Sequence, residues 1–275
     1  MTEAEVKRCI ESSRWGKERA LSYWDMVKPT YLENWPPAMH SLSMASIDVP
    51  LTVEEARRLG TNIIEFGETF LESGEIQYDV PDIHQRVADA VAKLPNGAFV
   101  RLGSRSPKDS WEGSKHGFKT SVGDDPLRFV LDCSERMCED LSLAIQNNYA
   151  PHIWVRQWMT IPRWAEFRCF MRDRQLVGIS QYNYLKGESF PEIVSDPDMI
   201  QWVIRDNFFP DFRRASHLAD VVFDVWVKPS PMRDNTRVWE TKLVEINPWI
   251  ELTDPCLFAW NDGFNGEFRY GKEKP

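Results

Sequence analysis

The sequence lacks the short signatures of several protein classes. Its five cysteines are scattered and odd in number, with no Cys-x-x-Cys pair, so we expect reduced thiols rather than a disulfide framework or a zinc finger. Its five histidines form no local cluster. Neither the Gly-x-x-x-x-Gly-Lys-Ser/Thr loop nor the Gly-x-Gly-x-x-Gly fingerprint occurs, so the common phosphate-binding loops are excluded.

Long apolar segments and an excess of positive charge are also missing. No segment reaches the roughly 20 apolar residues that cross a bilayer, and the charged N-terminal residues do not resemble a signal peptide. We therefore expect a soluble, cytoplasmic protein without a membrane partner. The net charge of -9 argues against general binding of polyanions, which needs a concentrated basic surface. A local basic site for nucleotide phosphates, or for an RNA end, stays open.

The chain of 275 residues is long enough for one large domain or two packed lobes. Capping-box spacing at Thr2 and Thr52 predicts helix starts, the second for a short helix through Leu59. Further helices are predicted at 82–94 and 134–147. Strands are predicted at 98–102, 152–158, 167–172, 175–181, 220–228 and 237–247. The pattern predicts an α+β fold, with a mixed N-terminal lobe over residues 1–150 and a C-terminal lobe of largely antiparallel sheet over 151–275.

Two of the predicted strands carry oxygen-bearing side chains on one face. Side chains alternate along a strand, so Asp224 points away from Phe223 and Val225, and Glu245 and Asn247 share a face of the later strand. If the strands pair as a hairpin, these three polar side chains converge. Two carboxylates and an amide oxygen are ligands that suit Mg²⁺. An ordinary solvated sheet face explains the pattern equally well.

Arginine and lysine side chains in two places are candidates for phosphate binding. Arg168 lies among aromatic residues in a predicted strand, where its burial is costly without an anion or a carboxylate. It would stabilise a transferring phosphate, and a structural salt bridge is the alternative. The loop after the first predicted strand carries Arg101, Arg105 and Lys108. These cations could bind phosphates or simply solvate a mobile loop.

In their order along the chain, these segments resemble the cell division cycle one-two-three family, a branch of the ATP-grasp superfamily. The resemblance runs from about Ala98 to Trp260, over half of the chain. Its most specific stretches are Phe99–Leu102, Ser106–Asp109, Val155–Trp158 followed by Ile161–Pro162, Glu166–Phe170, Leu176–Gln181, Phe223–Asp224, Asn247–Pro248, Thr253–Asp254 and Leu257–Trp260. It implies a two-lobed ATP-grasp-like fold that binds ATP and Mg²⁺.

The resemblance also implies a role for each candidate residue. The residues that would bind ATP are Arg101, Lys108, Val155, Arg156, Gln157, Trp158 and Arg168. Residues 155–158 would hold adenine through backbone groups, and Arg168 would act as the catalytic residue at the terminal phosphates. The residues that would coordinate Mg²⁺ are Asp224, Glu245 and Asn247.

The chain departs from the family pattern at several of these positions. Arg101 stands where the family usually carries Lys, and Glu245 where Asp is usual. Residues 103–105 read Gly-Ser-Arg in place of Asn-Trp-Ser, and residues 181–183 read Gln-Tyr-Asn in place of Gln-Arg-Asp. The departures cluster on the open side of the implied site, where a substrate would lie.

Two functions follow from this resemblance. The main prediction is an ATP- and magnesium-dependent ligase that forms an amide or peptide bond, such as a small-peptide or cyclic-dipeptide biosynthetic enzyme. Its substrate would be an unidentified small molecule or peptide, and an RNA-end ligase is a variant of the same class. The alternative is an ATP-binding assembly chaperone for a translation initiation factor, as the eukaryotic members of the family imply.

Overall fold

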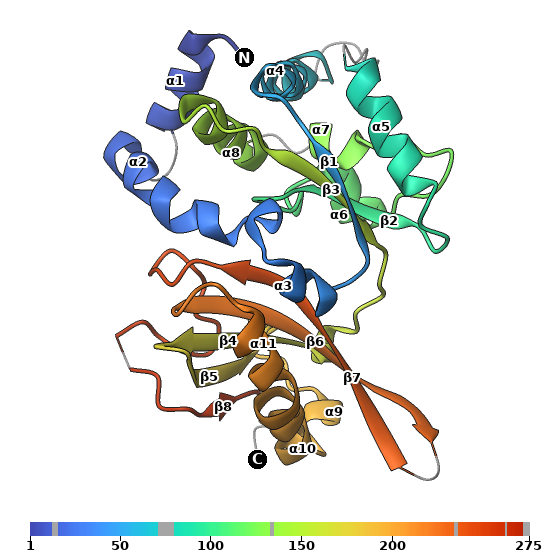
Figure 1. Ribbon diagram of the computed structural model, residues 1–275, viewed down its shortest axis with the longest axis vertical. Coiled ribbons are helices and arrows are strands. Elements are labelled where there is room, and N and C mark those ends of the chain that lie inside the picture. The colour runs from blue at the N-terminus through green and yellow to red at the C-terminus, as the bar shows by residue number, and fades with distance from the viewer. Residues whose placement is uncertain (13–15, 71–79, 133–134, 234–235, 262, 272–275) are drawn as a thin grey trace. The chain divides into compact units, whose positions relative to one another are not determined.

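The chain folds into two compact units (Figure 1). The computed structural model describes residues 1–12, 16–70, 80–132, 135–233, 236–261 and 263–271. The first unit comprises Met1–Asn34 and Ala45–Trp158, and the second comprises Trp35–Met44 and Met159–Pro275. This division differs from the single predicted boundary after residue 150. The physical reason is that residues 152–157 form a strand that pairs on both sides with strands of the first unit.

The first unit combines helices with a small antiparallel sheet. Its three strands are β1 (Ser46–Pro50), β2 (Ala98–Leu102) and β3 (His152–Gln157), in the order β1-β3-β2. Its α-helices are α1 (Glu3–Ser12), α2 (Gly16–Val27), α4 (Val53–Phe70), α5 (Pro81–Val91), α6 (Trp111–His116), α7 (Arg128–Leu131) and α8 (Glu135–Gln146). Two short 3₁₀ turns, η1 (Lys28–Thr30) and η2 (Leu32–Asn34), follow α2.

Both predicted capping boxes are confirmed at the atomic level. At α1, the Thr2 N–H donates to Glu5 Oε2 over 2.6 Å and the Glu5 N–H donates to Thr2 Oγ1 over 3.2 Å. The corresponding distances between Thr52 and Glu55 at α4 are 2.7 and 3.1 Å. These bonds satisfy N–H groups that have no partner within the first turn. The predicted end of the second helix at Leu59 is wrong, because α4 continues to Phe70 and buries Leu59 in the core.

The sheet of the first unit has one apolar face. Val100 lies opposite Val155 and Leu102 opposite Ile153, and all four side chains are buried in the core. The same core receives Leu59 from α4, Ile83 and Val87 from α5, and Leu141 from α8. Burying one such side chain contributes about 1.5–3 kcal/mol. The amphipathic patterns of α5 and α8 therefore position the helices on this face of the sheet.

The second unit contains a larger, mostly antiparallel sheet. Its strands are β4 (Glu166–Arg172), β5 (Gln175–Gln181), β6 (Val221–Arg233), β7 (Thr236–Asn247) and β8 (Phe268–Arg269), in the order β7-β6-β4-β5-β8. Among the pairings between these strands in the described part of the chain, only that of β5 with β8 is parallel. Its helices are α3 (Pro37–Ser41), the turn η3 (Arg163–Ala165), α9 (Pro191–Val194), α10 (Pro197–Trp202), the π-helix η4 (Val203–Phe208) and α11 (Phe209–Ala215). The predicted α+β class with antiparallel sheets is confirmed.

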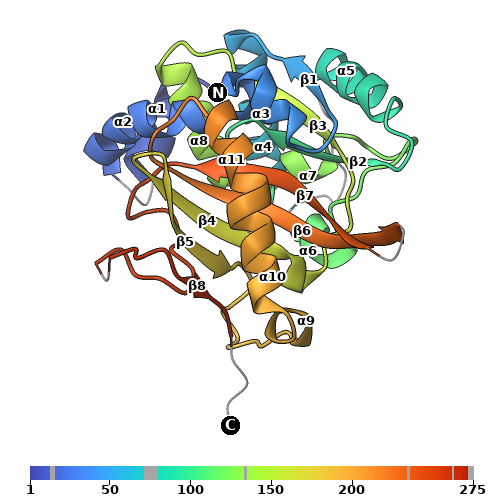
Figure 2. The same cartoon turned by 60° about the horizontal axis from the view of Figure 1, so that its bottom comes forward.

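Aromatic side chains cover both faces of this second sheet. On one face, Phe212 of α11 stacks on Phe223 of β6 with ring centroids 4.0 Å apart, and the helices α10 and α11 run across the sheet in Figure 2. On the other face, Phe170 of β4 packs against the rings of Trp249, Phe258, Trp260 and Phe264. Each favourable aromatic pair adds about 0.5–1.5 kcal/mol beyond its buried area. The segment after β7 is therefore held firmly on the sheet.

The chain inserts a short segment of early sequence at the edge of β7. The Leu243 N–H donates to the Leu42 carbonyl over 2.8 Å, and Ser43 Oγ donates to the Leu243 carbonyl over 2.6 Å. Leu243 lies at a bulge, where β7 carries an extra residue against Asp224 and Val225 of β6. The inserted segment therefore covers part of an edge that would otherwise stay open.

The described residues can be compared with the expectations for membrane-spanning helices and for the cysteines. No helix among them is long and apolar enough to cross a membrane. Four cysteines are free thiols, namely Cys9, Cys138, Cys169 and Cys256. The fifth, Cys133, lies outside the described residues.

Candidate functional site

A buried ion pair lies in the middle of the second unit's sheet. The antiparallel register of β4 and β6 places Arg168 opposite Asp224. Arg168 Nε donates to Asp224 Oδ1 and Nη2 donates to Oδ2, each over 2.8 Å. Nη1 donates to the Asp254 carbonyl over 2.9 Å. The Asp224 side chain is 0% exposed and that of Arg168 is 6% exposed. This bidentate contact is the structural salt bridge that the sequence left open as an alternative role for Arg168.

The pair keeps Arg168 charged in spite of its burial. Burial opposes the charged guanidinium, but the facing Asp224 carboxylate outweighs it and raises the pKa of Arg168 well above its ordinary value. Breaking a buried pair of this kind by removing one partner costs about 3–5 kcal/mol, because the other charge stays buried alone. Arg168 and Asp224 therefore depend on each other for their stability in the buried sheet.

The structure brings the three predicted metal ligands together. In the pairing of β6 with β7, Asp224 lies opposite Glu245, and Val222, two positions earlier on the same face of β6, lies opposite Asn247. The bulge after Asp224 leaves Val244 as the extra residue of β7. The prediction from strand alternation therefore holds as geometry, because Asp224, Glu245 and Asn247 lie on the same face of one hairpin.

The chemistry of these side chains fits a hard cation. The Asn247 Oδ1 atom is a ligand of the kind that a cation takes, whereas Nδ2 is a buried donor with no hydrogen-bond partner among the described residues. An ionised carboxylate can accept about four contacts, and that of Asp224 accepts two from Arg168. The described residues hold no group of three or more His, Cys, Asp and Glu side chains arranged for a metal. The set of two carboxylates and one amide falls outside that description, and the magnesium site stays a prediction.

Residues beyond the predicted set complete the surroundings of Arg168. The ring of Tyr182 lies 4.9 Å from the guanidinium carbon. The Asp254 carboxylate accepts from Tyr184 Oη over 2.9 Å and from the Cys256 N–H over 2.8 Å. Burial, together with Asp254, raises the pKa of Tyr184 to about 12, so this phenol stays a donor at neutral pH. Thr253–Asp254 was part of the resemblance, but no pattern assigned Asp254 a role.

The first unit places Arg101 and Arg156 on the sheet face opposite its core. Arg101 lies opposite Trp154, and Arg156 lies opposite Phe99. Both arginines are buried, and Arg101 Nε donates to the carbonyl of Leu102 over 2.9 Å. Val155 instead points into the apolar core. Of the residues predicted to bind ATP in this unit, the two arginines therefore share a face of the sheet.

The backbone of the predicted adenine-binding segment is partly used within the first unit. The Gln157 N–H donates to the Ala45 carbonyl over 2.7 Å, and the Trp158 N–H donates to the Gly97 carbonyl over 2.9 Å. These two donors already have partners. An adenine bound here would have to use the other backbone groups of this segment.

The loop after β2 does not behave as one flexible basic segment. Arg105 Nη2 forms an ion pair with Asp140 of α8 over 2.9 Å, and its side chain is 10% exposed. Burial opposes this charge, but Asp140 and nearby acidic groups raise the pKa of Arg105 above its ordinary value. Further along, the Lys108 N–H donates to the Ser106 carbonyl over 2.9 Å in a tight turn. Arg105 is therefore a structural residue, and Lys108 remains the loop's candidate for a phosphate.

The glycine at residue 103 makes room for the partly buried acid Glu33. A Cβ atom on Gly103 would lie 1.6 Å from Glu33 Oε2. Glu33 accepts from Tyr149 Oη over 3.0 Å and from Trp154 Nε1 over 3.3 Å, and burial raises its pKa. The departure from the family's usual Asn therefore has a physical cause. The sequence held no signal for it, because Glu33 is 70 positions earlier.

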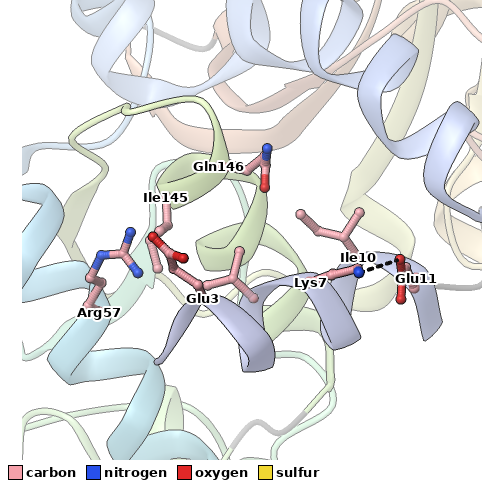
Figure 3. A pocket seen from close by; sticks show the side chains of 8 residues that line it. Glu3, Lys7, Ile10, Glu11, Arg57, Ile145 and Gln146 are labelled. Atoms are coloured by element: carbon pink, nitrogen blue, oxygen red, sulfur yellow. Dashed lines mark ion pairs between the residues drawn. The ribbon is translucent and has the colours of Figure 1, made fainter.

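A separate groove lies on the helical side of the first unit (Figure 3). It has a volume of about 480 Å³. Apolar side chains of α1 and α8 form its floor, and charged side chains surround it, including Lys7 and Glu11, which are paired at 4.0 Å. None of the predicted site residues lines it. The groove therefore gives no support to the nucleotide site.

Comparisons with known proteins give the chain's relatives. Residues 65–270 match the D123 family. "Cell division cycle protein 123" of Phaeosphaeria nodorum is 27% identical over 193 residues, which cover 66% of this chain and 48% of the relative. The "Translation initiation factor eIF2 assembly protein" of Kluyveromyces lactis is 30% identical over 198 residues, which cover 66% of this chain and 50% of the relative. That of Botryotinia fuckeliana is 30% identical over 192 residues, covering 65% and 44%.

The fold has a relative of known structure. Cdc123 from Schizosaccharomyces pombe aligns with a TM-score of 0.67 at 19% identity, over 91% of this chain and 95% of that one. At this identity the likeness establishes a shared fold. The chain spans about half the length of the curated relatives it matches.

Proposed function

Because this chain belongs to the D123 family, we propose that it is an assembly factor for a translation initiation factor. The observation that carries the proposal is the name of its relatives, several of which are translation initiation factor eIF2 assembly proteins. The proposal includes a cytoplasmic location and a translation factor as the protein partner.

The main prediction from the sequence, a peptide-bond-forming ligase, is wrong. Relatives that match about two thirds of the chain are named for assembly of eIF2 and for the cell division cycle, and not for ligation. The departures on the open side of the implied site suggested a specialised enzyme. One of them has a structural cause instead, since Gly103 accommodates Glu33.

We further propose that the chain binds ATP with Mg²⁺ in a two-lobed ATP-grasp arrangement. In the second unit, Asp224, Glu245 and Asn247 would hold the cation, and Arg168 orients Asp224 through its two bonds. In the first unit, Arg101 and Lys108 would face the phosphates. Bound nucleotide would supply binding energy that tunes affinity for the partner. The buried amide nitrogen of Asn247, without a partner among the described residues, supports a polar occupant at this place.

The assembly function can be tested with purified components. The chain is mixed with purified eIF2 of Kluyveromyces lactis, and with its separated subunits, and binding is measured by calorimetry. We expect a one-to-one complex with at least one unassembled subunit, with a dissociation constant in the micromolar range or tighter, as about -8 kcal/mol of binding free energy gives. Absence of binding to the factor and to every subunit would overturn the assembly function.

A further inference from the structure

The second unit's sheet ends in a strand with one open edge. β8 is the last strand in the sheet order and pairs only with β5 among the described residues; it is the outermost strand of this sheet in Figure 1 and Figure 2. Towards β5, the Glu267 carbonyl accepts from the Ile179 N–H over 3.0 Å, and the Gly271 N–H donates to Gln181 Oε1 over 3.1 Å. Backbone groups alternate along a strand, so the N–H and C=O of Phe268 point away from β5. An edge of this kind is a template for another strand.

A groove with a volume of about 690 Å³ runs along this edge. One wall is formed by Glu267, Phe268 and Arg269 around β8. The facing wall is formed by Pro197, Asp198 and Gln201 of α10. A groove between an edge strand and a helix has the shape that accepts an extended peptide.

The charges in the groove leave one carboxylate available. Arg269 Nε pairs with Glu267 Oε2 over 3.1 Å, and its guanidinium lies 4.2 Å from the centre of the Phe258 ring. A bond from the Asn265 side chain, together with Arg269, lowers the pKa of Glu267, so this pair is ionised and mutually neutral. Asp198 is exposed and has no ion pair or hydrogen bond among the described residues. The groove therefore favours a cationic side chain next to α10.

Two large exposed apolar side chains belong to the same helix, α10. Trp202 is 52% exposed and Met199 is 36% exposed. Trp202 is three positions after Met199 and four after Asp198, so on the helix surface it lies next to both, just outside the residues that line the groove. Exposed Trp and Met are enriched at protein interfaces, whereas a phosphate backbone would be repelled by the unpaired carboxylate.

We propose that the groove between β8 and α10 binds an extended peptide segment of a protein partner. The peptide backbone pairs with the outward N–H and C=O of Phe268, a Lys or Arg side chain reaches Asp198, and apolar side chains cover Trp202 and Met199. This proposal does not depend on the assembly function, since it identifies the occupant by its backbone and charge alone.

The test uses peptides of the stated chemistry on the full chain. The probe is an acetylated octapeptide of alternating lysine and valine, and the matched control is the same peptide with glutamate in place of lysine. Binding is followed by NMR through the Trp202 indole and the Phe268 amide. We expect the lysine peptide to shift both signals and to slow hydrogen exchange of the Phe268 amide, and the glutamate peptide to do neither. A lysine peptide that is N-methylated at alternate positions should bind at least about tenfold more weakly, because it cannot pair as a strand.

Matched variants make the test specific to this groove. Asp198→Lys should weaken the lysine peptide at least tenfold, while Asp25→Lys, the same charge reversal at an exposed position of α2, should leave it within twofold. Trp202→Ala should weaken it, and Trp111→Ala, at a 50% exposed tryptophan, should not. Equal binding of both peptides, equal effects of the two charge reversals, or no shift at Trp202 and Phe268 would overturn the proposal. So would self-association through β8 that excludes the peptide, seen by analytical ultracentrifugation.

Discussion

Two buried arginines, one in each unit, show how similar sequence features reach different structural roles. Arg168 uses Nε, Nη1 and Nη2, two of them on Asp224 and one on the Asp254 carbonyl. Arg105 uses Nη2 on Asp140, while its Nη1 lies 3.9 Å from Glu139 and has no hydrogen-bond partner among the residues that the structure describes. Strand register aligns both oxygens of Asp224 with the guanidinium fork, whereas a loop meets a helix at Arg105. Burial and an acidic partner alone therefore do not mark a functional site; Glu245 and Asn247 on the same face of the sheet distinguish Arg168.

The largest expected difference between the two arginines is in stability. Asp224→Asn keeps the side-chain size but leaves the Arg168 charge buried, so the free energy of unfolding should fall by about 3–5 kcal/mol. Asp140→Asn removes a single hydrogen-bonded contact of Arg105 and should cost about 1–3 kcal/mol. Urea unfolding of each variant measures both losses. Equal losses would show that the bidentate geometry of Arg168 adds nothing.

A second experiment probes the close contact of the first unit. Gly103→Ala places a Cβ against Glu33, and overpacking of this kind costs about 1–3 kcal/mol. The double variant with Glu33→Ala removes the clashing carboxylate, so its unfolding free energy should lie above that expected from adding the two single losses. Additive losses, in thermal or urea unfolding, would mean that Gly103 is not there to accommodate Glu33.

The predicted metal site gives Arg168 a function that Arg105 lacks. Glu245→Gln removes a charge from the set beside Asp224, and magnesium-dependent ATP affinity should fall at least tenfold, or about 1.4 kcal/mol. Glu240→Gln is the control on the same strand, because Glu240 pairs with Lys228 over 3.3 Å and is not a predicted ligand. Calorimetry with ATP and Mg²⁺ measures both variants. The magnesium prediction is wrong if Glu245→Gln binds nucleotide as well as Glu240→Gln does.

The smallest expected effect is on the pH dependence of the first unit. Burial raises the pKa of Glu33 above its ordinary value of 4.5 in spite of its bonds and the nearby His152. A raised folded pKa means that folding favours the protonated carboxyl. The stabilising contribution of Glu33 to the free energy of unfolding is therefore fully present below pH 4.5, and it declines as the pH rises through the folded pKa. Unfolding free energies measured upward from pH 4.5 should show this decline in the native chain and less of it in Glu33→Gln. An unchanged slope in that variant would contradict the assignment to Glu33.

Local features of the fold and of the candidate site could be predicted from the sequence. The capping boxes at Thr2 and Thr52 form as expected because their partners lie three residues apart. The turn between β4 and β5 occurs at Asp173 and Arg174, both with positive φ, where a polar pair separates two apolar runs. The adjacency of Asp224, Glu245 and Asn247 followed from the period of two along paired strands.

The amino-acid sequence by itself determined the elements whose physics is local: helix starts, strand alternation and the tight turn, together with the family. Only the tertiary structure decided which distant groups meet. Arg168 donates to Asp224, which is 56 positions later, and Glu33 accepts from Tyr149, which is 116 positions later. Leu42 pairs with the edge of β7 at Leu243. Each of these contacts depends on strand order and on packing in the core, because a buried charge or backbone group must be satisfied by whichever residue the fold brings within hydrogen-bond distance.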